Sequence, residues 1–241
     1  MSMPFHGQIG IVTGAGSGIG RAIAVRFAEL GGTPCLVGRD RSKLDAVADV
    51  VREGSSEVLV RACDLTRDDD LQRLADGVTN LRRLDLVVHS AAEWDSESFL
   101  QTTPALLDGQ YSINVRAPHA LTRLLLPQLE QSRGQIVFMN SSAVYGATPG
   151  LTAYGSMKRA LKGLADHLRS EVNSRGVRVL SVFAGRTATP MQRRVSEKEG
   201  KPYRPKLLLQ PEDVASVVAH VLALPRTAEV TEIHIRPMRK T

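Results

Sequence analysis

The hydrophobic and polar positions along the chain form two kinds of segment that alternate. Short, continuously apolar runs are typical of buried strands, whereas apolar residues at every third or fourth position predict amphipathic helices. The apolar runs predict strands at 9–12, 33–38, 57–63, 84–89, 134–140, 177–183 and 232–235. The helical spacing predicts helices at 21–30, 42–53, 67–78, 103–131, 154–174 and 211–224, with Ser42 as the cap of the second.

Strands and helices alternate without an internal repeat or a polar linker. This order indicates an α/β fold: a single-domain, Rossmann-type, doubly wound parallel sheet with helices on both faces. The 241 residues suffice for one such domain, 1–241, and are few for two. Segment 190–205 departs from the alternation because it is polar, basic and without clear periodicity. We interpret it as a mobile lid over a substrate.

Composition and charge exclude several classes of function. The net charge is +6, but the basic residues are scattered and only 4% of residues are aromatic, which disfavours a nucleic-acid partner. Cys35 and Cys63 lie in apolar stretches without metal-ligand spacing, so we expect reduced thiols, no metal site and a cytoplasmic location. Residues 1–8 hold no long apolar stretch, and no run reaches the ~20 apolar residues of a membrane span. We therefore expect no signal peptide and no membrane association.

A glycine-rich turn, Thr13-Gly14-Ala15-Gly16-Ser17-Gly18-Ile19-Gly20, joins the first predicted strand to the first helix. Glycine lets the backbone approach an anion, and the N–H groups and dipole of a helix N-terminus stabilise negative charge. The turn therefore predicts a pyrophosphate site. Its spacing is T-G-x-x-x-G-x-G rather than the common dinucleotide fingerprint, which needs glycine where Ile19 stands.

Arg39 follows the second predicted strand, where the adenosine ribose of a dinucleotide lies in folds of this type. An acidic residue at this place accepts hydrogen bonds from the ribose 2′-hydroxyl, whereas arginine accommodates a 2′-phosphate. Gly38 closes the strand and Arg39 comes next, so the sequence favours NADP over NAD. The alternative is that Arg39 is a solvated turn residue and Asp40 contacts the ribose.

Tyr154 and Lys158 are four residues apart, so they lie on one face of the predicted helix. They follow Ser141 and Ser142 at a strand end. Together with the glycine turn, this set resembles the short-chain dehydrogenase/reductase family over essentially the whole chain. The resemblance implies that Tyr154 is the general acid or base and that Ser141 donates to the substrate oxygen. It further implies that Lys158 lowers the pKa of Tyr154 and holds the nicotinamide ribose, and that Asn114 opens its helix locally and holds a water beneath Lys158.

The resemblance also assigns contacts to the cofactor. They comprise the glycine-turn residues Gly14, Ser17, Gly18, Ile19 and Gly20, then Arg39, Asp64 at the adenine, Ala91, Tyr154, Lys158, Gly185, and Thr189 at the nicotinamide carboxamide. One segment departs from the family, because His89-Ser90-Ala91-Ala92 stands where Asn-Asn-Ala-Gly is usual. We interpret His89 as a hydrogen-bonded structural residue.

The resemblance implies an NADP-dependent oxidoreductase that transfers a hydride between a nicotinamide cofactor and a small-molecule carbonyl or alcohol substrate. The altered segment 89–92 leaves open an alternative, a dinucleotide-binding sensor or scaffold without turnover. The usual separation of thirteen positions before Tyr154 selects Ser141, while a loop one residue shorter selects Ser142. Family members commonly form dimers or tetramers through their two long helices, here 103–131 and 154–174, so we expect a homo-oligomer.

Overall fold

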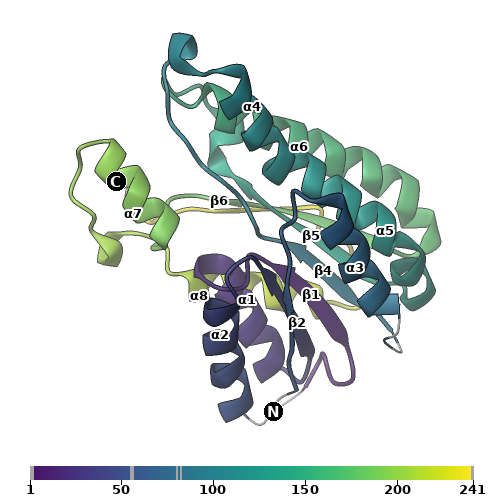
Figure 1. The fold of residues 1–241 in the computed structure, drawn as a ribbon. Helices are drawn as coiled ribbons and strands as arrows, with labels where there is room; N and C mark the ends of the chain where they lie inside the picture. Colours follow the sequence, from purple (N-terminus) through teal and green to yellow (C-terminus); the bar gives the residue numbers. More distant parts are fainter. Residues whose placement is uncertain (1–2, 55–56, 80, 82, 240–241) are drawn as a thin grey trace.

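The computed structural model describes residues 3–54, 57–79, 81 and 83–239. Within these residues the strands form one seven-stranded sheet in the order β3-β2-β1-β4-β5-β6-β7, with every neighbouring pair parallel (Figure 1). The strands are β1 Ile9–Thr13, β2 Thr33–Gly38, β3 Leu59–Ala62, β4 Leu86–His89, β5 Gln135–Ser141, β6 Arg178–Ala184 and β7 Glu232–Ile235. The doubly wound parallel sheet predicted from the sequence is confirmed.

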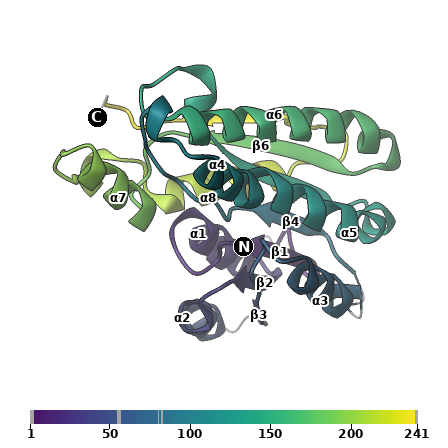
Figure 2. The same ribbon diagram turned by 45° about the horizontal axis from the view of Figure 1, so that its top comes forward.

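Helices cover both faces of the sheet (Figure 1, Figure 2). The helices are α1 Gly18–Glu29, α2 Arg41–Glu53, α3 Asp68–Thr79, α4 Pro104–Tyr111, α5 Ala117–Ser132, α6 Thr152–Val172, α7 Pro190–Lys198 and α8 Pro211–Leu222. Buried side chains of α1, α2 and α8 form one core cluster, and those of α3, α5 and α6 form the other. There are two clusters because adjacent residues of a strand point to opposite faces of the sheet. On β1, Val12 belongs to the first cluster and Ile11 to the second.

The helix predicted at 103–131 is interrupted, which corrects the expectation of one continuous helix. A π-helical segment, Ser112–Arg116, separates α4 from α5. Its centre is Asn114, whose side-chain Nδ2 donates to the backbone oxygen of Gln110 at 3.0 Å. That oxygen is the acceptor four residues back, so the side-chain amide competes with the helical ladder and the turn widens. The local opening expected around Asn114 is therefore present.

The predicted cap of the second helix was wrong by two positions. Asp40, rather than Ser42, is the N-cap of α2, and its carboxylate accepts a hydrogen bond from the Lys43 backbone N–H at 3.2 Å. The hydroxyl of Ser42 instead donates to that carboxylate at 2.7 Å. Asp40 is thus committed to the start of α2.

The segment at 190–205 contains a helix that the sequence pattern did not predict. Thr189 caps α7 by accepting a hydrogen bond from Gln192 N–H at 3.1 Å, and Pro190 occupies the first turn. The helix gives way to Gly200, whose φ of +64° is left-handed. Although α7 stands beside the sheet's carboxyl edge (Figure 1), its motion as a lid is still a prediction.

The chain leaves the centre of the sheet in two directions, through β1, β2 and β3 on one side and β4, β5 and β6 on the other. Neighbouring β1 and β4 are therefore followed by loops that diverge, and a crevice opens beyond their carboxyl ends. The candidate site lies there. In the described part of the chain, none of the helices combines the length and the apolar character needed to cross a bilayer.

Candidate active site

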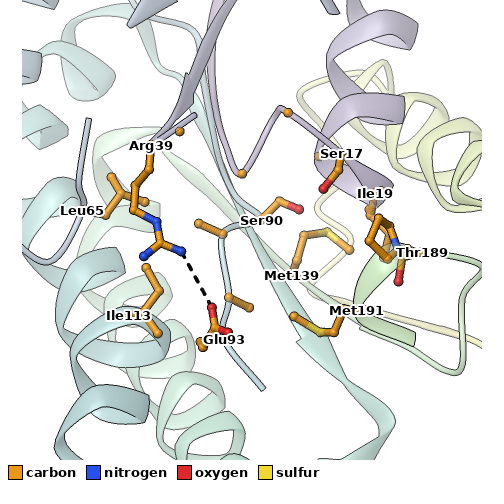
Figure 3. Close-up of a pocket in the computed structure, with 18 of the residues that line it drawn as sticks. Ser17, Ile19, Arg39, Leu65, Ser90, Glu93, Ile113, Met139, Thr189 and Met191 are labelled. Atoms are coloured by element: carbon orange, nitrogen blue, oxygen red, sulfur yellow. Dashed lines mark ion pairs between the residues drawn. The ribbon is translucent and has the colours of Figure 1, made fainter. Parts of the chain in front are cut away.

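A cavity of about 650 Å³ lies beyond the carboxyl ends of the central strands (Figure 3). This volume is in the range of sites for small molecules and cofactors. The sequence-predicted residues that line it are Gly14, Ser17, Gly18, Ile19, Gly20, Arg39, Asp64, Ala91, Tyr154, Lys158 and Thr189. Asn114, Ser141 and Gly185 are not among its lining residues.

The glycine turn and the turn after β4 are packed directly against each other. Gly14 has a φ of +67°, and a Cβ there would lie 2.8 Å from the backbone nitrogen of Ala91. A Cβ on Gly20 would lie 2.5 Å from the oxygen of Gly14, so both positions require glycine. The hydroxyl of buried Thr13 accepts hydrogen bonds from the N–H groups of Ser90 and Ala91, at 3.0 and 3.2 Å. These contacts fix the floor of the cavity.

The N-terminus of α1 faces the cavity through Gly18, Ile19 and Gly20. The N-cap residue, Ser17, makes no side-chain hydrogen bond to the helix, and the first turn holds no acidic residue. The helix dipole at this end is thus not offset by a protein carboxylate. A pyrophosphate fits this cradle, because glycines allow close approach and the helix end favours negative charge.

Basic residues line the end of the cavity beyond β2. Arg39 and Lys43 both contribute to the lining. Asp40 lies between them, but its carboxylate is engaged by α2, and hydrogen bonds from Ser42 and Lys43 lower its pKa to about 2. Lys43 Nζ also lies 3.2 Å from Asp40 Oδ2, so this end of the cavity holds two cations beside a carboxylate that is committed to α2.

Asp64 stands at the adenine end, after β3. Its carboxylate accepts hydrogen bonds from the Thr66 N–H at 3.0 Å and the Thr66 hydroxyl at 2.7 Å. These bonds lower the pKa of Asp64. The side chain therefore closes a local turn and lines the cavity at the same time, and its contact with an adenine is still a prediction.

Ser141, Tyr154 and Lys158 come together where β5 ends and α6 begins. The hydroxyl of Ser141 lies on the Tyr154 side of this junction, near enough to the phenol to lower its pKa. Lys158 Nζ lies 5.7 Å from the centroid of the Tyr154 ring and donates to the Met139 backbone oxygen at 3.1 Å. Ser142 begins the following turn and is exposed. Of the two serines, Ser141 is thus the one whose hydroxyl meets the tyrosine.

Burial governs the ionisation of this pair. It raises the pKa of Tyr154, and the hydrogen bond from Ser141 opposes the rise. Burial also lowers the pKa of Lys158 from 10.5 to about 8. In this structure burial therefore outweighs the lowering of the Tyr154 pKa that was expected from Lys158. The phenol stays protonated at neutral pH, which is the form that can donate a proton.

Asn114 lies buried in the π-helical segment, which packs against α6. Its Nδ2 donates to the backbone oxygen of Glu93 at 2.9 Å as well as to Gln110. Its Oδ1 is buried and has no hydrogen-bond partner among the described residues. A buried acceptor of this kind suits a residue that holds a water.

His89 points away from the cavity and into the α5 layer. Its Nε2 lies 2.8 Å from the Thr122 hydroxyl, and its ring stacks on Phe138 with centroids 4.9 Å apart. Burial lowers the pKa of His89 to about 3, so the imidazole is neutral. The interpretation of His89 as a hydrogen-bonded structural residue agrees with this geometry.

Gly185 is placed outside the cavity lining. Its N–H donates to the Ile235 oxygen at 2.8 Å, and a Cβ there would lie 3.0 Å from Pro237 Cδ. The position thus serves the contact between the ends of β6 and β7. Thr189, four residues later, does line the cavity. It packs close to Gly18, where an added Cβ would lie 3.0 Å from Thr189 Cγ2.

Three charged cavity residues were missed by sequence reasoning, Lys43, Glu93 and Asp95. Lys43 lies in the first turn of α2. The direction of its side chain depends on where α2 begins, which the sequence pattern placed one residue late. Glu93 and Asp95 follow segment 89–92, which departs from the family, and no local pattern marks them. The described residues contain no group of three or more His, Cys, Asp or Glu side chains arranged to hold a metal ion.

Residues 8–200 match the family model described as short chain dehydrogenase. The chain belongs to the short-chain dehydrogenase/reductase family. It is 30% identical over 233 residues to an uncharacterized oxidoreductase of Staphylococcus aureus, a match that covers 96% of this chain and 97% of the relative. The protein is accordingly an NAD(P)-dependent oxidoreductase.

Two solved structures are similar to this protein in fold. A metagenomic short-chain oxidoreductase in complex with NADP is 29% identical, with a TM-score of 0.84 over 98% of this chain and 100% of the other. A 7 alpha-hydroxysteroid dehydrogenase complexed with NADH and a 7-oxo bile acid is 23% identical, with a TM-score of 0.88 over 97% and 94% of the two chains. The latter likeness concerns the fold alone. The family match and the relative in complex with NADP support a nicotinamide cofactor without establishing a preference for NADP.

Proposed function

We propose that this oxidoreductase prefers NADP and interconverts a small-molecule carbonyl and its alcohol, with Ser141, Tyr154 and Lys158 as the catalytic residues. The observation that carries the proposal is the buried pair of Tyr154 and Lys158 in the cavity wall, with Lys158 Nζ 5.7 Å from the Tyr154 ring centroid and Ser141 beside the phenol.

The residues that would hold the cofactor follow the cavity from end to end. The N-terminus of α1 would bind the pyrophosphate, Arg39 the 2′-phosphate, Lys158 the nicotinamide ribose and Thr189 the carboxamide. When bound, the nicotinamide supplies or accepts the hydride. Arg39 carries the NADP preference because a guanidinium makes charge-assisted hydrogen bonds to a phosphate, while the one carboxylate of the 39–43 segment is committed to capping α2.

Tyr154 completes the reduction by giving its phenolic proton to the carbonyl oxygen as the carbonyl carbon receives the hydride. The Ser141 hydroxyl donates to the same oxygen and stabilises the negative charge that develops there. The cation of Lys158 then favours the phenolate until a proton returns, and oxidation of the alcohol runs in reverse. Asn114, through its buried Oδ1, would hold the water that returns the proton.

The departure at 89–92 was the main support for a sensor without turnover. In the structure Ser90 and Ala91 are held by Thr13, and His89 is bound in the α5 layer. The altered segment therefore keeps the cavity floor that an enzyme and a sensor both need, and the Ser141, Tyr154 and Lys158 set beside it favours the enzyme. We also propose a homo-oligomer and a cytoplasmic location, consistent with the free, buried thiols of Cys35 and Cys63.

The test is a panel of ketones, aldehydes, sugars and acyl thioesters, assayed by NADPH oxidation. We expect turnover of at least one class, a higher kcat/KM with NADPH than with NADH, and loss of this preference in Arg39→Gln. Cofactor binding without reduction of any carbonyl in the panel would favour the sensor. Equal use of both cofactors by the unmodified protein would contradict the NADP preference.

A further inference from the structure

Glu93 places a carboxylate inside the cavity, between two arginines from distant parts of the chain. Its Oε2 lies 4.0 Å from Arg39 Nη2 (Figure 3), and its Oε1 lies 3.4 Å from both Nη1 and Nη2 of Arg194 on α7. Its backbone oxygen accepts a hydrogen bond from Asn114 at 2.9 Å. The backbone is thus anchored, while the side chain is shared between two cations.

A carboxylate in this position opposes the binding of a polyanionic cofactor. It also occupies the guanidinium that the proposed function assigns to the 2′-phosphate. The Arg39 and Glu93 side chains are 72% and 42% exposed, so their ion pair is weak. A phosphate monoester carries nearly two negative charges at neutral pH and three strong acceptor oxygens, so it can displace a single exposed carboxylate.

We infer that Glu93 is a specificity-determining residue for the cofactor: it is the counter-ion of Arg39 that a 2′-phosphate must displace. NADPH would meet this competition in full, whereas NADH, which has no 2′-phosphate, leaves the Arg39–Glu93 pair in place. Glu93 therefore lowers the preference for NADPH below what Arg39 alone would give. The inference rests on the proposed role of Arg39.

Arg194 is a second ion-pair partner of Glu93, and it lowers the free-energy cost of separating Glu93 from Arg39. When the phosphate takes Arg39, the Glu93 carboxylate keeps an ion pair with α7 and is not left alone in the cavity. The same helix is bound to the 93–97 segment by Lys198, whose Nζ lies 3.9 Å from Asp95 and 2.5 Å from Glu97. Loss of Arg194 should accordingly leave Glu93 committed to Arg39 and weaken NADPH binding.

The test is a double-mutant cycle of Arg39→Gln and Glu93→Gln, with the dissociation constants of NADPH and NADH measured at low salt. Trp94, the single tryptophan of the chain, adjoins Glu93 and reports binding by its fluorescence without any turnover. Glu97→Gln is the matched control, because it removes one negative charge from the same segment, and Glu97 pairs with Lys198 rather than Arg39. Glu93 is half-exposed, so its amide variant should fold normally, which a thermal melt verifies.

We expect Glu93→Gln to raise the ratio of the NADH to the NADPH dissociation constant about two- to fivefold, the range of an exposed ion pair. Arg39→Gln should lower this ratio, and Glu93→Gln added to Arg39→Gln should leave it unchanged. Glu97→Gln should resemble the unmodified protein, and Arg194→Gln should lower the ratio only when Glu93 is present. The effect of Glu93→Gln should shrink as salt shortens the screening length.

The outcomes separate the inference from the function on which it rests. An unchanged ratio in Arg39→Gln would refute the role of Arg39 at the phosphate, and with it the basis of the inference. A lowered ratio in Arg39→Gln together with no change in Glu93→Gln would refute the inference alone. So would an equal tightening of NADPH and NADH in Glu93→Gln, or an effect of that change that persists without Arg39, because either result indicates general repulsion.

Discussion

The cofactor-free protein should become more stable when its buried lysine is replaced by methionine. Lys158 is 2% exposed, and burial lowers its pKa from 10.5 to about 8. Each pKa unit corresponds to about 1.4 kcal/mol, so keeping the charged form in the fold costs about 3 kcal/mol at pH 7. Methionine has a similar length and no charge. Its substitution loses the hydrogen bond to Met139, worth about 1 kcal/mol, which leaves a net gain of about 2 kcal/mol.

The sign of the pH dependence makes this prediction specific. Between about pH 8 and 10.5 the unfolded chain binds a proton at Lys158 that the folded protein releases, so the stability of the unmodified protein rises with pH relative to the variant. The cost of the buried charge should fall to about 1 kcal/mol at pH 9.5, where Lys158→Met and the unmodified protein should be nearly equal in stability.

Urea unfolding at fixed protein concentration and without cofactor, followed at pH 7, 8 and 9.5, measures these free energies. Lys162→Met is the control, because Lys162 forms ion pairs with Asp166 and Glu232 at 2.7 and 2.6 Å, which help to raise its pKa to about 12. That variant should gain no stability. A Lys158→Met protein that is no more stable at pH 7, or whose difference from the unmodified protein is independent of pH, would refute the reasoning.

Other predictions concern catalysis, cofactor binding and assembly. Ser141→Ala should lower kcat by about a hundredfold or more, since it removes a donor to the developing oxyanion, while Ser142→Ala keeps most activity; the reverse pattern would move the role to Ser142. NADPH binding near pH 8 should be accompanied by proton uptake, because the bound cofactor raises the pKa of Lys158 from about 8. Calorimetry in buffers of different ionisation enthalpy measures this uptake, and Lys158→Met should show none. Gly14→Ala should abolish cofactor binding because its φ is +67° and the new Cβ meets Ala91, whereas Gly163→Ala, with nothing within 4 Å, should bind normally and be slightly more stable. Light scattering should show a dimer or tetramer, and a monomer at assay concentration would contradict the oligomer.

The fold could be predicted because its signals are local and strong. The strands at 33–38 and 232–235 were predicted with the bounds that the structure has; the first is a short, mostly apolar run, and the second alternates polar residues with Ile233 and Ile235. The glycine turn could be recognised for the same reason. Glycine is required at Gly14 and Gly20 by close contacts within one strand–turn–helix unit and with the turn after the neighbouring strand.

The features that the hydrophobic pattern did not show depend on competing hydrogen bonds or on distant partners. Asn114 widens a helix whose apolar spacing is unbroken, so periodicity alone predicted one helix there. Helix α7 is short and polar, and its Thr-Pro start and glycine end are weaker signals than an apolar face. The Glu93–Arg194 contact joins residues 101 positions apart. No local pattern encodes a pairing of that kind, which arises only when α7 meets the turn after β4.

The central claim, that Tyr154 is the proton donor of a carbonyl reductase, is tested most directly by Tyr154→Phe. The change removes one oxygen from a buried side chain beside Ser141 and leaves the ring packing in place. With a carbonyl that the unmodified protein reduces, NADPH binding should stay within a fewfold by Trp94 fluorescence, while kcat for reduction falls to the background rate. Reduction by Tyr154→Phe at a rate near that of the unmodified protein, with binding intact, would contradict the account.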